Sequence, residues 1–380
     1  MTGQCYKYIS HREQRDDYLI RIKVNGTVVT KCARTIQDAV RIRNDLLKQY
    51  GLDKKLFLKV HKQAQALPVP KLAEAFDRYM EEAVNKRGLA PSTIYKYEEA
   101  KRLVNHILGK LRIDEIRQDI WQDTFSAIQS HRHLSHNYLK ANVGRYRSMY
   151  DWYIKKGQLQ ENPIRNIELT KTPQERRKIF TVSEKNSFLR EARLYDYQFF
   201  FMFNLLFESG MRRGELLALQ WKDIEFGEKR LHVNKSIGKG IVNGEYQEFC
   251  GKTKTAASVR SIPLSDRTSF MLRIMYEKTS PKQDDFVFTL KNSWSKYPWV
   301  SLSRIDYVFA LIRDKAGLDK GLSIHAIRHY VVSKLMMANV DIKTVQELGG
   351  WAKASTLLDI YAHSNEAAKR QALQTALFTR

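Results

Sequence analysis

The spacing of hydrophobic residues changes along the chain, and this change divides the sequence into parts that must fold differently. Residues 18–24 alternate between apolar and polar, Asn25-Gly26 is a type I′ hairpin signal, and residues 27–32 return as a second strand. From residue 71 onwards the apolar residues recur mostly with helical spacing. A chain of 380 residues is also too long for one ordinary domain. We therefore expect several domains, mainly α-helical with small β elements.

The expected divisions lie at segments rich in proline or charge. A basic stretch that ends at Pro68 and Pro70 is interpreted as one linker, and a charged stretch around Pro173 as a second. Thr181 and Glu184 have the spacing of a capping box and predict a new helix after the second linker. We expect, in order, a three-stranded sheet with a helix at 1–60, a linker at 61–70, a helical domain at 71–168, a linker at 169–178 and a mixed α/β domain at 179–380.

The charge of the chain indicates a polyanionic partner. Lysine and arginine number 65 against 41 aspartate and glutamate, which gives a net charge of +24. No apolar run approaches the roughly 20 residues that a membrane-spanning helix needs, so nucleic acid is favoured over a membrane. The three cysteines, Cys5, Cys32 and Cys250, are odd in number and lack ligand spacing. They fit a reducing cytosol and argue against disulfides or a zinc site.

Several basic residues outside the last motifs are candidate DNA contacts. In the N-terminal module we expect them on the solvent face of the sheet, because a two-stranded ribbon fits a DNA groove. A merely solvated sheet face is the alternative, and in the helical domain phosphate contact and simple solvation are equally open. The candidates are Lys7, Arg21, Lys23 and Lys31 in the module, Arg145 and Arg147 in the helical domain, and Arg213 in the last domain.

Arg212 lies in a predicted bend between two buried helices. Residues 199–207 are almost continuously apolar, and Gly210 can end that helix as a left-handed cap. Glu215 belongs to the start of the next helix, so Arg212 has two interpretations. It either pairs structurally with Glu215 or holds two oxygens of a phosphate with its planar guanidinium.

The remaining candidates are far apart in sequence, and each alone would be assigned a structural role. Lys254 lies between predicted strands, and His325 and Arg328 share one side of a helix start. Trp351 follows a glycine pair that ends a helix, and Tyr361 lies in a short amphipathic segment. Together with Arg212 they supply two guanidiniums, an ammonium, an imidazole, an indole N–H and a phenol. This set can attack a phosphodiester with a side-chain oxygen, with no metal or cofactor and no nucleotide-binding motif.

In this order, the motifs resemble those of the tyrosine recombinase (phage integrase) family over about 180–380. The family patterns T-G-x-R-x-G-E, K-T-x-x-S-x-R-x-I-P-L, H-x-x-R-H and L-G-H…Y match residues 209–215, 254–264, 325–329 and 348–361. Ser209 replaces the threonine of the first pattern, and Trp351 stands at the histidine of the last. Lys252 is the alternative to Lys254 as the family lysine. More loosely, the N-terminal module resembles an arm-type DNA-binding module, and 71–168 a SAM-like core-binding domain.

The resemblance implies a role for each candidate residue. Tyr361 would be the nucleophile, and ionising a phenol of pKa ~10 at pH 7 costs about 4 kcal/mol unless neighbours help. Cations and proton carriers would reduce that cost and stabilise the transition state. Arg212 and Arg328 would stabilise the charge of the transition state, and Trp351 would donate to a non-bridging oxygen. His325 would accept the proton of the tyrosine, and Lys254 would give a proton to the leaving 5′ oxygen. Glu215 would orient Arg212 or His325.

The function implied is that of an integrase of a phage or other mobile element. It would cut and rejoin DNA through a 3′-phosphotyrosyl intermediate and a Holliday junction, as a homotetramer on core and arm sites. DNA-bending or directionality proteins would be further partners. The amphipathic tail at 366–378 would dock on a neighbouring protomer or fold back on its own domain. Three alternatives stay open: a chromosome-dimer-type recombinase, which would lack residues 1–60, a non-catalytic architectural protein, and a relaxing enzyme of the type IB topoisomerase kind.

Overall fold

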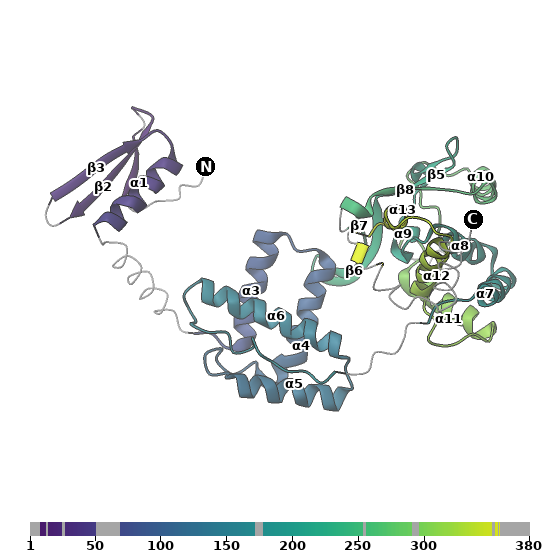
Figure 1. Ribbon diagram of the computed structural model, residues 1–380, viewed down its shortest axis with the longest axis horizontal. Helices are drawn as coiled ribbons and strands as arrows, with labels where there is room; N and C mark the ends of the chain where they lie inside the picture. The colour runs from purple at the N-terminus through teal and green to yellow at the C-terminus, as the bar shows by residue number, and fades with distance from the viewer. Residues whose placement is uncertain are drawn as a thin grey trace, which may run out of the picture. The chain divides into compact units, whose positions relative to one another are not determined.

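The chain forms two compact units, which are described separately (Figure 1). The first comprises Met1–Gly88 and Tyr97–Thr172, and the second Leu89–Lys96 and Pro173–Arg380. In this computed structural model the described residues are 8–12, 14–24, 27–50, 69–171, 178–253, 256–290, 296–351, 354–355 and 357. Residues 61–68 of the expected linker and the tail at 366–378 lie outside these residues. No helix in the described ranges has the length and apolar character needed to cross a membrane.

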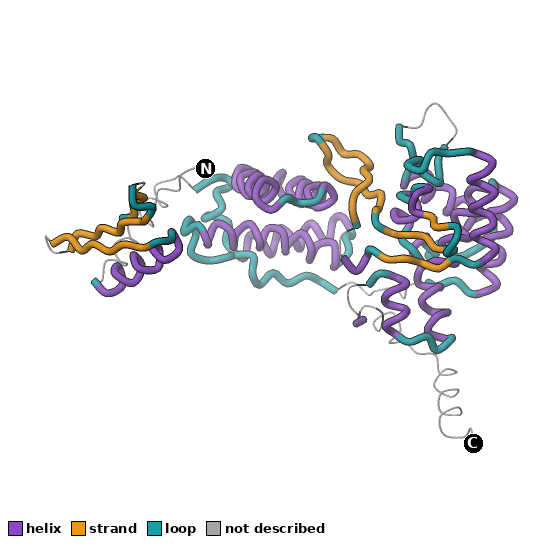
Figure 2. Tube along the Cα trace, turned by 90° about the horizontal axis from the view of Figure 1, so that it is seen from above, coloured by secondary structure: helices purple, strands orange, loops and turns teal. Residues whose placement is uncertain are grey.

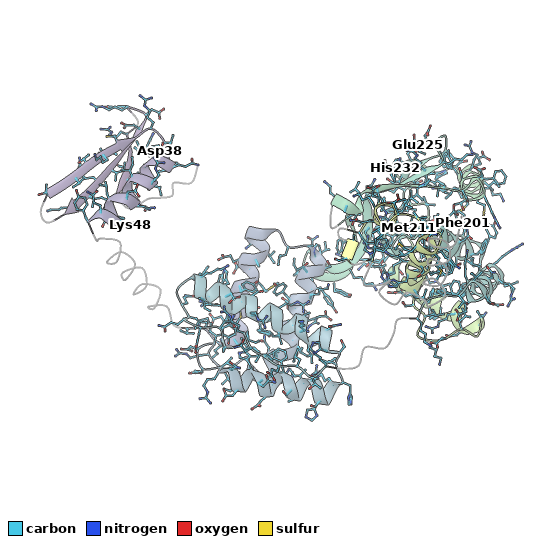
Figure 3. All side chains as sticks on the ribbon, in the orientation of Figure 1. Asp38, Lys48, Phe201, Met211, Glu225 and His232 are labelled. Carbon is cyan, nitrogen blue, oxygen red and sulfur yellow. The ribbon has the colours of Figure 1, made fainter. Side chains whose placement is uncertain are left out.

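A three-stranded antiparallel sheet and one helix form the N-terminal part of the first unit, as expected. Thr35 begins the helix, because its side chain accepts a hydrogen bond from the backbone N–H of Asp38. Asp38 near the start and Lys48 near the end complement the helix dipole (Figure 3). Ile20 and Ile22 are buried beneath the helix. The elements, in sheet order and then chain order, are β1 (Ile9–Arg12), β2 (Asp17–Val24), β3 (Thr27–Ala33) and α1 (Ile36–Gln49).

The strand register corrects one expectation about the basic face of this sheet. Arg21 and Lys23 alternate with the buried Ile20 and Ile22, so they lie on the outer face as expected. Lys31 pairs directly with Ile20 and therefore lies on the face that carries the core. It is nevertheless exposed, because β3 is an edge strand.

The helical part of the first unit has an aromatic core. Phe76 and Tyr79 lie one turn apart on the first helix and are fully buried, and Trp121 and Tyr146 are buried with them. Pro91 is the first residue of its helix, where its fixed φ and missing N–H are tolerated. The four helices are α3 (Leu72–Arg87), α4 (Pro91–Leu108, which belongs to this unit from Tyr97 onwards), α5 (Gln118–Arg132) and α6 (His136–Lys155).

The segment after α6 returns along α5 and is bound to it. Gln122 accepts from the backbone N–H of Glu168 at 2.9 Å and donates to its carbonyl at 2.8 Å. Gln129, seven residues and two turns later, makes the same pair of bonds to Thr170 at 3.1 and 2.8 Å. The backbone of Thr170, the second residue of the predicted linker at 169–178, is thus held on a helix.

The second unit is built around one apolar helix, α8. Its buried Phe201 and Phe203 are packed among the other helices, and Met211 just beyond it is also buried (Figure 3). The predicted capping box at Thr181 and Glu184 is present, with both reciprocal hydrogen bonds. The helices are α7 (Val182–Tyr195), α8 (Tyr197–Ser209), α9 (Arg213–Leu217), α10 (Asp266–Thr279), α11 (Leu302–Lys315), α12 (Ile324–Met337) and α13 (Ile342–Gly349), with short 3-10 turns η1 (Trp221–Asp223) and η2 (Ala256–Ser258).

Two small sheets lie between α9 and α10 in the chain. The expected strands near 230 and 260 pair with each other, in the sheet order β4-β5-β8. A long hairpin between them was not predicted, although Asn243-Gly244 at its turn was a readable signal (Figure 2). Both turn residues have positive φ, as a type I′ turn requires. The strands are β4 (Ile224–Glu225), β5 (Arg230–Val233), β6 (Lys235–Val242), β7 (Glu245–Lys252) and β8 (Arg260–Pro263).

Candidate active site

Arg212 is held at the start of α9 by a sharp turn after α8. Gly210 ends α8 with φ of +62°, and a Cβ there would lie 3.1 Å from a methyl group of Val331. The next residues bring Arg212 to the N-cap position, with its side chain 38% exposed. Arg212 therefore has a fixed backbone and a side chain that solvent can reach.

Glu215 binds Arg212 twice and is itself almost fully buried. Its Oε1 accepts from Nη1 of Arg212 at 2.6 Å, and its Oε2 accepts from the backbone N–H of Arg212 at 2.8 Å. Oε2 also accepts from Nη2 of Arg260 at 2.8 Å. Burial acts to raise the pKa of Glu215, but the bonds and charges of Arg260 and Arg212 together hold that pKa below its ordinary value. Glu215 is thus an ionised carboxylate shared by two arginines.

Arg328 comes from the first turns of α12 and is only 2% exposed. Its Nη1 donates to the carbonyl of Gly210 at 2.8 Å, and its Nη2 donates to the carbonyl of Gly349 at 2.6 Å. Burial lowers the pKa of Arg328, and the charge of Arg212 lowers it further. An anion close to both guanidiniums would offset this electrostatic cost.

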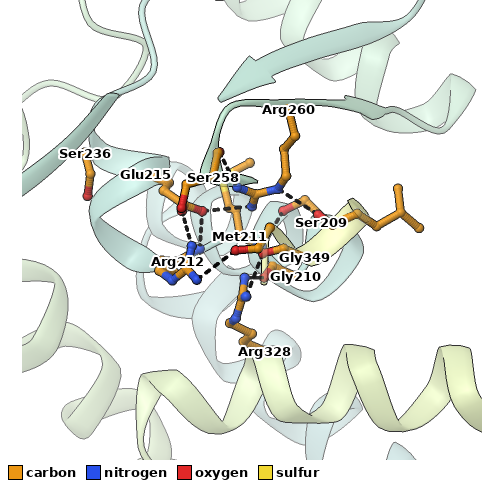
Figure 4. A network of polar contacts seen from close by, with 12 residues as sticks. Ser209, Gly210, Met211, Arg212, Glu215, Ser236, Ser258, Arg260, Arg328 and Gly349 are labelled. Atoms are coloured by element: carbon orange, nitrogen blue, oxygen red, sulfur yellow. Dashed lines mark hydrogen bonds and ion pairs between the residues drawn. The ribbon is translucent and has the colours of Figure 1, made fainter. Parts of the chain in front are cut away.

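Three arginines meet at the C-terminal end of α13 (Figure 4). Arg260, Arg328 and Arg212 donate to the successive carbonyls of residues 348, 349 and 350, at 2.7, 2.6 and 3.2 Å. The last carbonyls of a helix lack partners within it and carry partial negative charge, so cations stabilise them. We call these three side chains with their three carbonyls the arginine clamp. Among the described residues, Glu215 is the carboxylate that the clamp binds, so three positive charges minus one negative leave an excess of two there.

Trp351 lies directly against the arginine clamp. The Cζ atom of Arg328 is 3.5 Å from the centroid of the Trp351 ring, a cation–π stacking distance. The same ring packs on the Cα of Gly349, where an added Cβ would lie 1.4 Å from a ring carbon. Residue 349 must therefore be glycine for the indole to keep this place.

Of the other predicted members of the site, the structure describes some and not others. His325 is exposed one turn before Arg328, and its ring centroid lies 4.8 Å from that of His329. Lys254 and Tyr361 lie outside the described residues. Lys252, the alternative lysine, is the last residue of β7 and is exposed.

The chain shortly before Tyr361 is anchored in the second unit. Leu357, four residues earlier, is fully buried in a cluster with Val332 of α12 and Val345 of α13. Half-buried Trp351 also packs against this cluster. The same two helices therefore contact both Trp351 and Leu357, and α12 also carries Arg328.

The candidate DNA contacts differ in their surroundings. Arg213 forms an ion pair with Asp306 of α11, instead of extending freely. Arg145 donates to the Asn142 side chain at 2.9 Å, and Arg147 donates to a backbone carbonyl at 2.8 Å. Arg21, Lys23 and Lys31 are exposed on the N-terminal sheet, and Lys7 lies outside the described residues.

Sequence reasoning missed Arg260. This residue stands in the matched pattern at 254–264 but received no role, because an arginine at the start of a strand has no local feature that reveals distant partners. Its partners Glu215 and Leu348 lie 45 and 88 residues away in sequence.

Comparison with known proteins agrees with this geometry. The model of the phage integrase family matches residues 171–368, just over half of the chain. A XerC-like tyrosine recombinase of Caldanaerobacter subterraneus is 26% identical over 311 residues, which cover 75% of this chain and 77% of that protein.

Two solved structures share the fold. The Tn1549 transposon integrase in complex with transposon right end DNA has a TM-score of 0.68 at 18% identity, covering 80% of this chain and 99% of that one. A lambda integrase tetramer bound to a Holliday junction has a TM-score of 0.59 at 15% identity, covering 96% and 99%. With the family model, the ordered motifs and the paired arginines in agreement, the chain belongs to the phage integrase family, the tyrosine-type site-specific DNA recombinases.

Proposed function

We propose that this recombinase is the integrase of a mobile element, acting in the bacterial cytoplasm on core and arm DNA sites. The observation that carries the proposal is the convergence of Arg212 and Arg328 on adjacent carbonyls of α13. Although Arg212 and Arg328 are 116 positions apart in sequence, their guanidiniums meet at the end of α13, where positive charge is in excess. A scissile phosphate is the ligand that such a pair would bind, because its non-bridging oxygens can each accept from a different guanidinium.

The proposed cleavage step is a transesterification. The Tyr361 oxygen forms a bond to phosphorus as the bond from phosphorus to the 5′ oxygen breaks. The phenol gives its proton to His325, and the leaving 5′ oxygen gains one from Lys254. Arg212 and Arg328 stabilise the negative charge that spreads over the non-bridging oxygens, with Trp351 beside them. The phosphotyrosyl bond keeps the energy of the broken strand, so a second 5′-hydroxyl can reverse the step on another DNA.

The exposed Arg21 and Lys23 support a second DNA contact in the N-terminal module. Two sites on one protein would let it bridge arm and core DNA, a property that integration and excision require and simple resolution does not. A tetramer on a four-way junction is proposed by analogy with the lambda integrase structure, whose fold this chain shares.

The test is trapping of a covalent adduct on a nicked suicide substrate that carries the core site from the junctions of the element. With EDTA present, wild-type protein should give a protein–DNA adduct that survives SDS, and Tyr361→Phe should give none. Tyr307→Phe, on the exposed surface of α11, is the matched control and should react like wild type. Tight DNA binding without any adduct would contradict the proposed chemistry, and an adduct in Tyr361→Phe would assign the nucleophile to another residue.

A further inference from the structure

We propose that Arg260 is a positioning residue for strand cleavage, acting through Arg212 and the end of α13. The inference deepens the proposed function and rests on it. The Arg260 side chain is only 6% exposed, so it is poorly placed to bind DNA itself. Any effect it has on the reaction must pass through the groups that it contacts.

One guanidinium joins three separate segments of the second unit (Figure 4). Nη2 of Arg260 donates to Glu215 of α9 at 2.8 Å, and Nε donates to the Leu348 carbonyl of α13 at 2.7 Å. Nη1 donates to the Ser258 carbonyl at 3.1 Å, in the turn that follows the Lys254 segment. The planar fork satisfies three acceptors in different directions, which a single ammonium at the end of a lysine cannot do with the same geometry.

The charge balance around Glu215 gives Arg260 its effect on Arg212. With Arg212 as its sole cationic partner, the carboxylate would neutralise the guanidinium that is needed for the phosphate. Arg260 supplies a second positive charge to the same carboxylate, so Glu215 can orient Arg212 while the cluster stays positive. Glu215 then orients the Arg212 side chain without neutralising the positive charge of the cluster.

The bond to Leu348 extends the effect to the segment that leads to Trp351. The carbonyls of Gly349 and Gly350, which follow Leu348, accept from Arg328 and Arg212. Fixing the Leu348 carbonyl therefore fixes the spacing of the two arginines that would bind the phosphate. Misplacement of such groups by even ~1 Å can cost ~100-fold in rate.

The experiment compares Arg260→Lys with wild type in single-turnover cleavage at saturating suicide substrate. We expect the cleavage rate to fall by ~10- to 100-fold, with the Kd for DNA changed less than ~3-fold, because the arginines that it positions stabilise the transition state. Thr268→Val is the matched control. Its buried hydroxyl donates to Glu208 in the same unit, with no bond to the arginine clamp. It should lower the unfolding temperature without slowing cleavage.

A second substrate separates positioning from general destabilisation. A methylphosphonate at the scissile position lacks one negative oxygen, so the charge that Arg212 stabilises is smaller. The deficit of Arg260→Lys should shrink to within ~3-fold of wild type on this substrate, because less transition-state charge depends on Arg212. An equal deficit on both substrates, or no deficit on the phosphate, would overturn the inference. If wild type itself forms no adduct, the proposed function fails instead.

A third variant keeps the test decisive if Arg260→Lys does not fold. Glu215→Asp keeps the charge but withdraws it by one methylene, so one carboxylate can no longer reach both arginines in the observed geometry. We expect the same substrate-dependent deficit as for Arg260→Lys. A deficit that does not depend on the charge of the scissile group would again contradict a positioning role.

Discussion

The N-terminal sheet and the arginine clamp are both basic, but they hold their charges in opposite ways. On the sheet, Arg21 and Lys23 are exposed and alternate with the buried Ile20 and Ile22. In the clamp, Arg260 and Arg328 are buried and bonded to backbone carbonyls. The sheet has a solvated surface charge that can attract DNA at little structural cost. The clamp has a charge that is expensive to bury and is fixed in one geometry before any substrate arrives.

This difference predicts separate effects on rate and affinity. Exposed cations contribute to affinity in a salt-dependent manner, because each phosphate contact releases counterions. Preorganised cations at the reacting group contribute to the rate, because the protein does not reorganise as charge develops. Mutations in the two regions should therefore divide between the cleavage rate and the dissociation constant.

The largest expected effect is that of Arg328→Lys. A lysine keeps the charge but cannot span the carbonyls of Gly210 and Gly349 as the guanidinium does. We expect the single-turnover cleavage rate to fall by ~100- to 1000-fold with little change in DNA affinity. If circular dichroism shows a folded protein and its cleavage rate is within threefold of wild type, the clamp does not control the rate as this comparison requires.

Glu215→Gln should follow, with a ~10- to 100-fold loss of cleavage, because both Arg212 and Arg260 lose their shared anion. The variant should also be less stable than wild type at pH 7. Because the folded-state pKa of Glu215 is depressed, its stabilising contribution is present above the unfolded value of 4.5 and is lost as pH falls through the folded value.

Urea unfolding at pH 7 and at a series of pH values below 4.5 measures this linkage. The stability difference between wild type and Glu215→Gln should shrink as the pH falls through the folded pKa. Glu184→Gln, at the exposed capping box of α7, is the matched control and should show a small difference from wild type. A stability difference for Glu215→Gln that does not decrease with pH would contradict an ionised, shared carboxylate.

Gly349→Ala should have a smaller effect, a loss of cleavage of ~10-fold, because its methyl group would collide with the Trp351 ring and move it from Arg328. Tryptophan fluorescence and the cleavage rate would report the displacement. The control is Gly144→Ala in α6, where nothing lies within 4 Å of an added Cβ. That change should stabilise the protein by ~0.5–1 kcal/mol through helix propensity, with no change in cleavage.

The smallest effect is expected on the N-terminal sheet. Arg21→Gln with Lys23→Gln should weaken binding to arm-site DNA several-fold and reduce the slope of log K against log salt by ~1 per lost phosphate contact. Cleavage of a core-site substrate at saturation should not change. Lys31→Gln, on the other face of the same sheet, is the control and should leave arm binding intact. If the Lys31→Gln variant lost as much affinity for arm-site DNA as the double variant, the outer face of the sheet would not be the face that binds DNA.

Local patterns in the sequence predicted the helix ends, because these are fixed by residues close together in the chain. Thr181 begins its helix and Gly210 ends its helix as predicted, because capping involves groups within a few residues of each other. The β6–β7 hairpin was missed, since its strands contain glycine and charged residues that weaken the alternating pattern, although its Asn-Gly turn was visible.

The face of Lys31 and the role of Arg260 required the tertiary structure. The face of a residue on an edge strand follows from the register with its neighbour, and a shift by one residue would reverse it. Arg260 stands in a matched motif, but its three acceptors are Glu215 and two backbone carbonyls. Every residue has such a carbonyl, so no side-chain pattern identifies the ones that bind an arginine.

The sequence alone therefore determined the family and the order of the basic, imidazole, indole and phenol groups along the chain. The tertiary structure decided how the positive charges are stabilised. Arg212 and the Gly350 carbonyl that it binds are 138 residues apart, and only folding brings the end of α13 to the start of α9. The physical reason is that a buried guanidinium needs acceptors in three dimensions, and backbone geometry, which the residue types do not encode locally, supplies them.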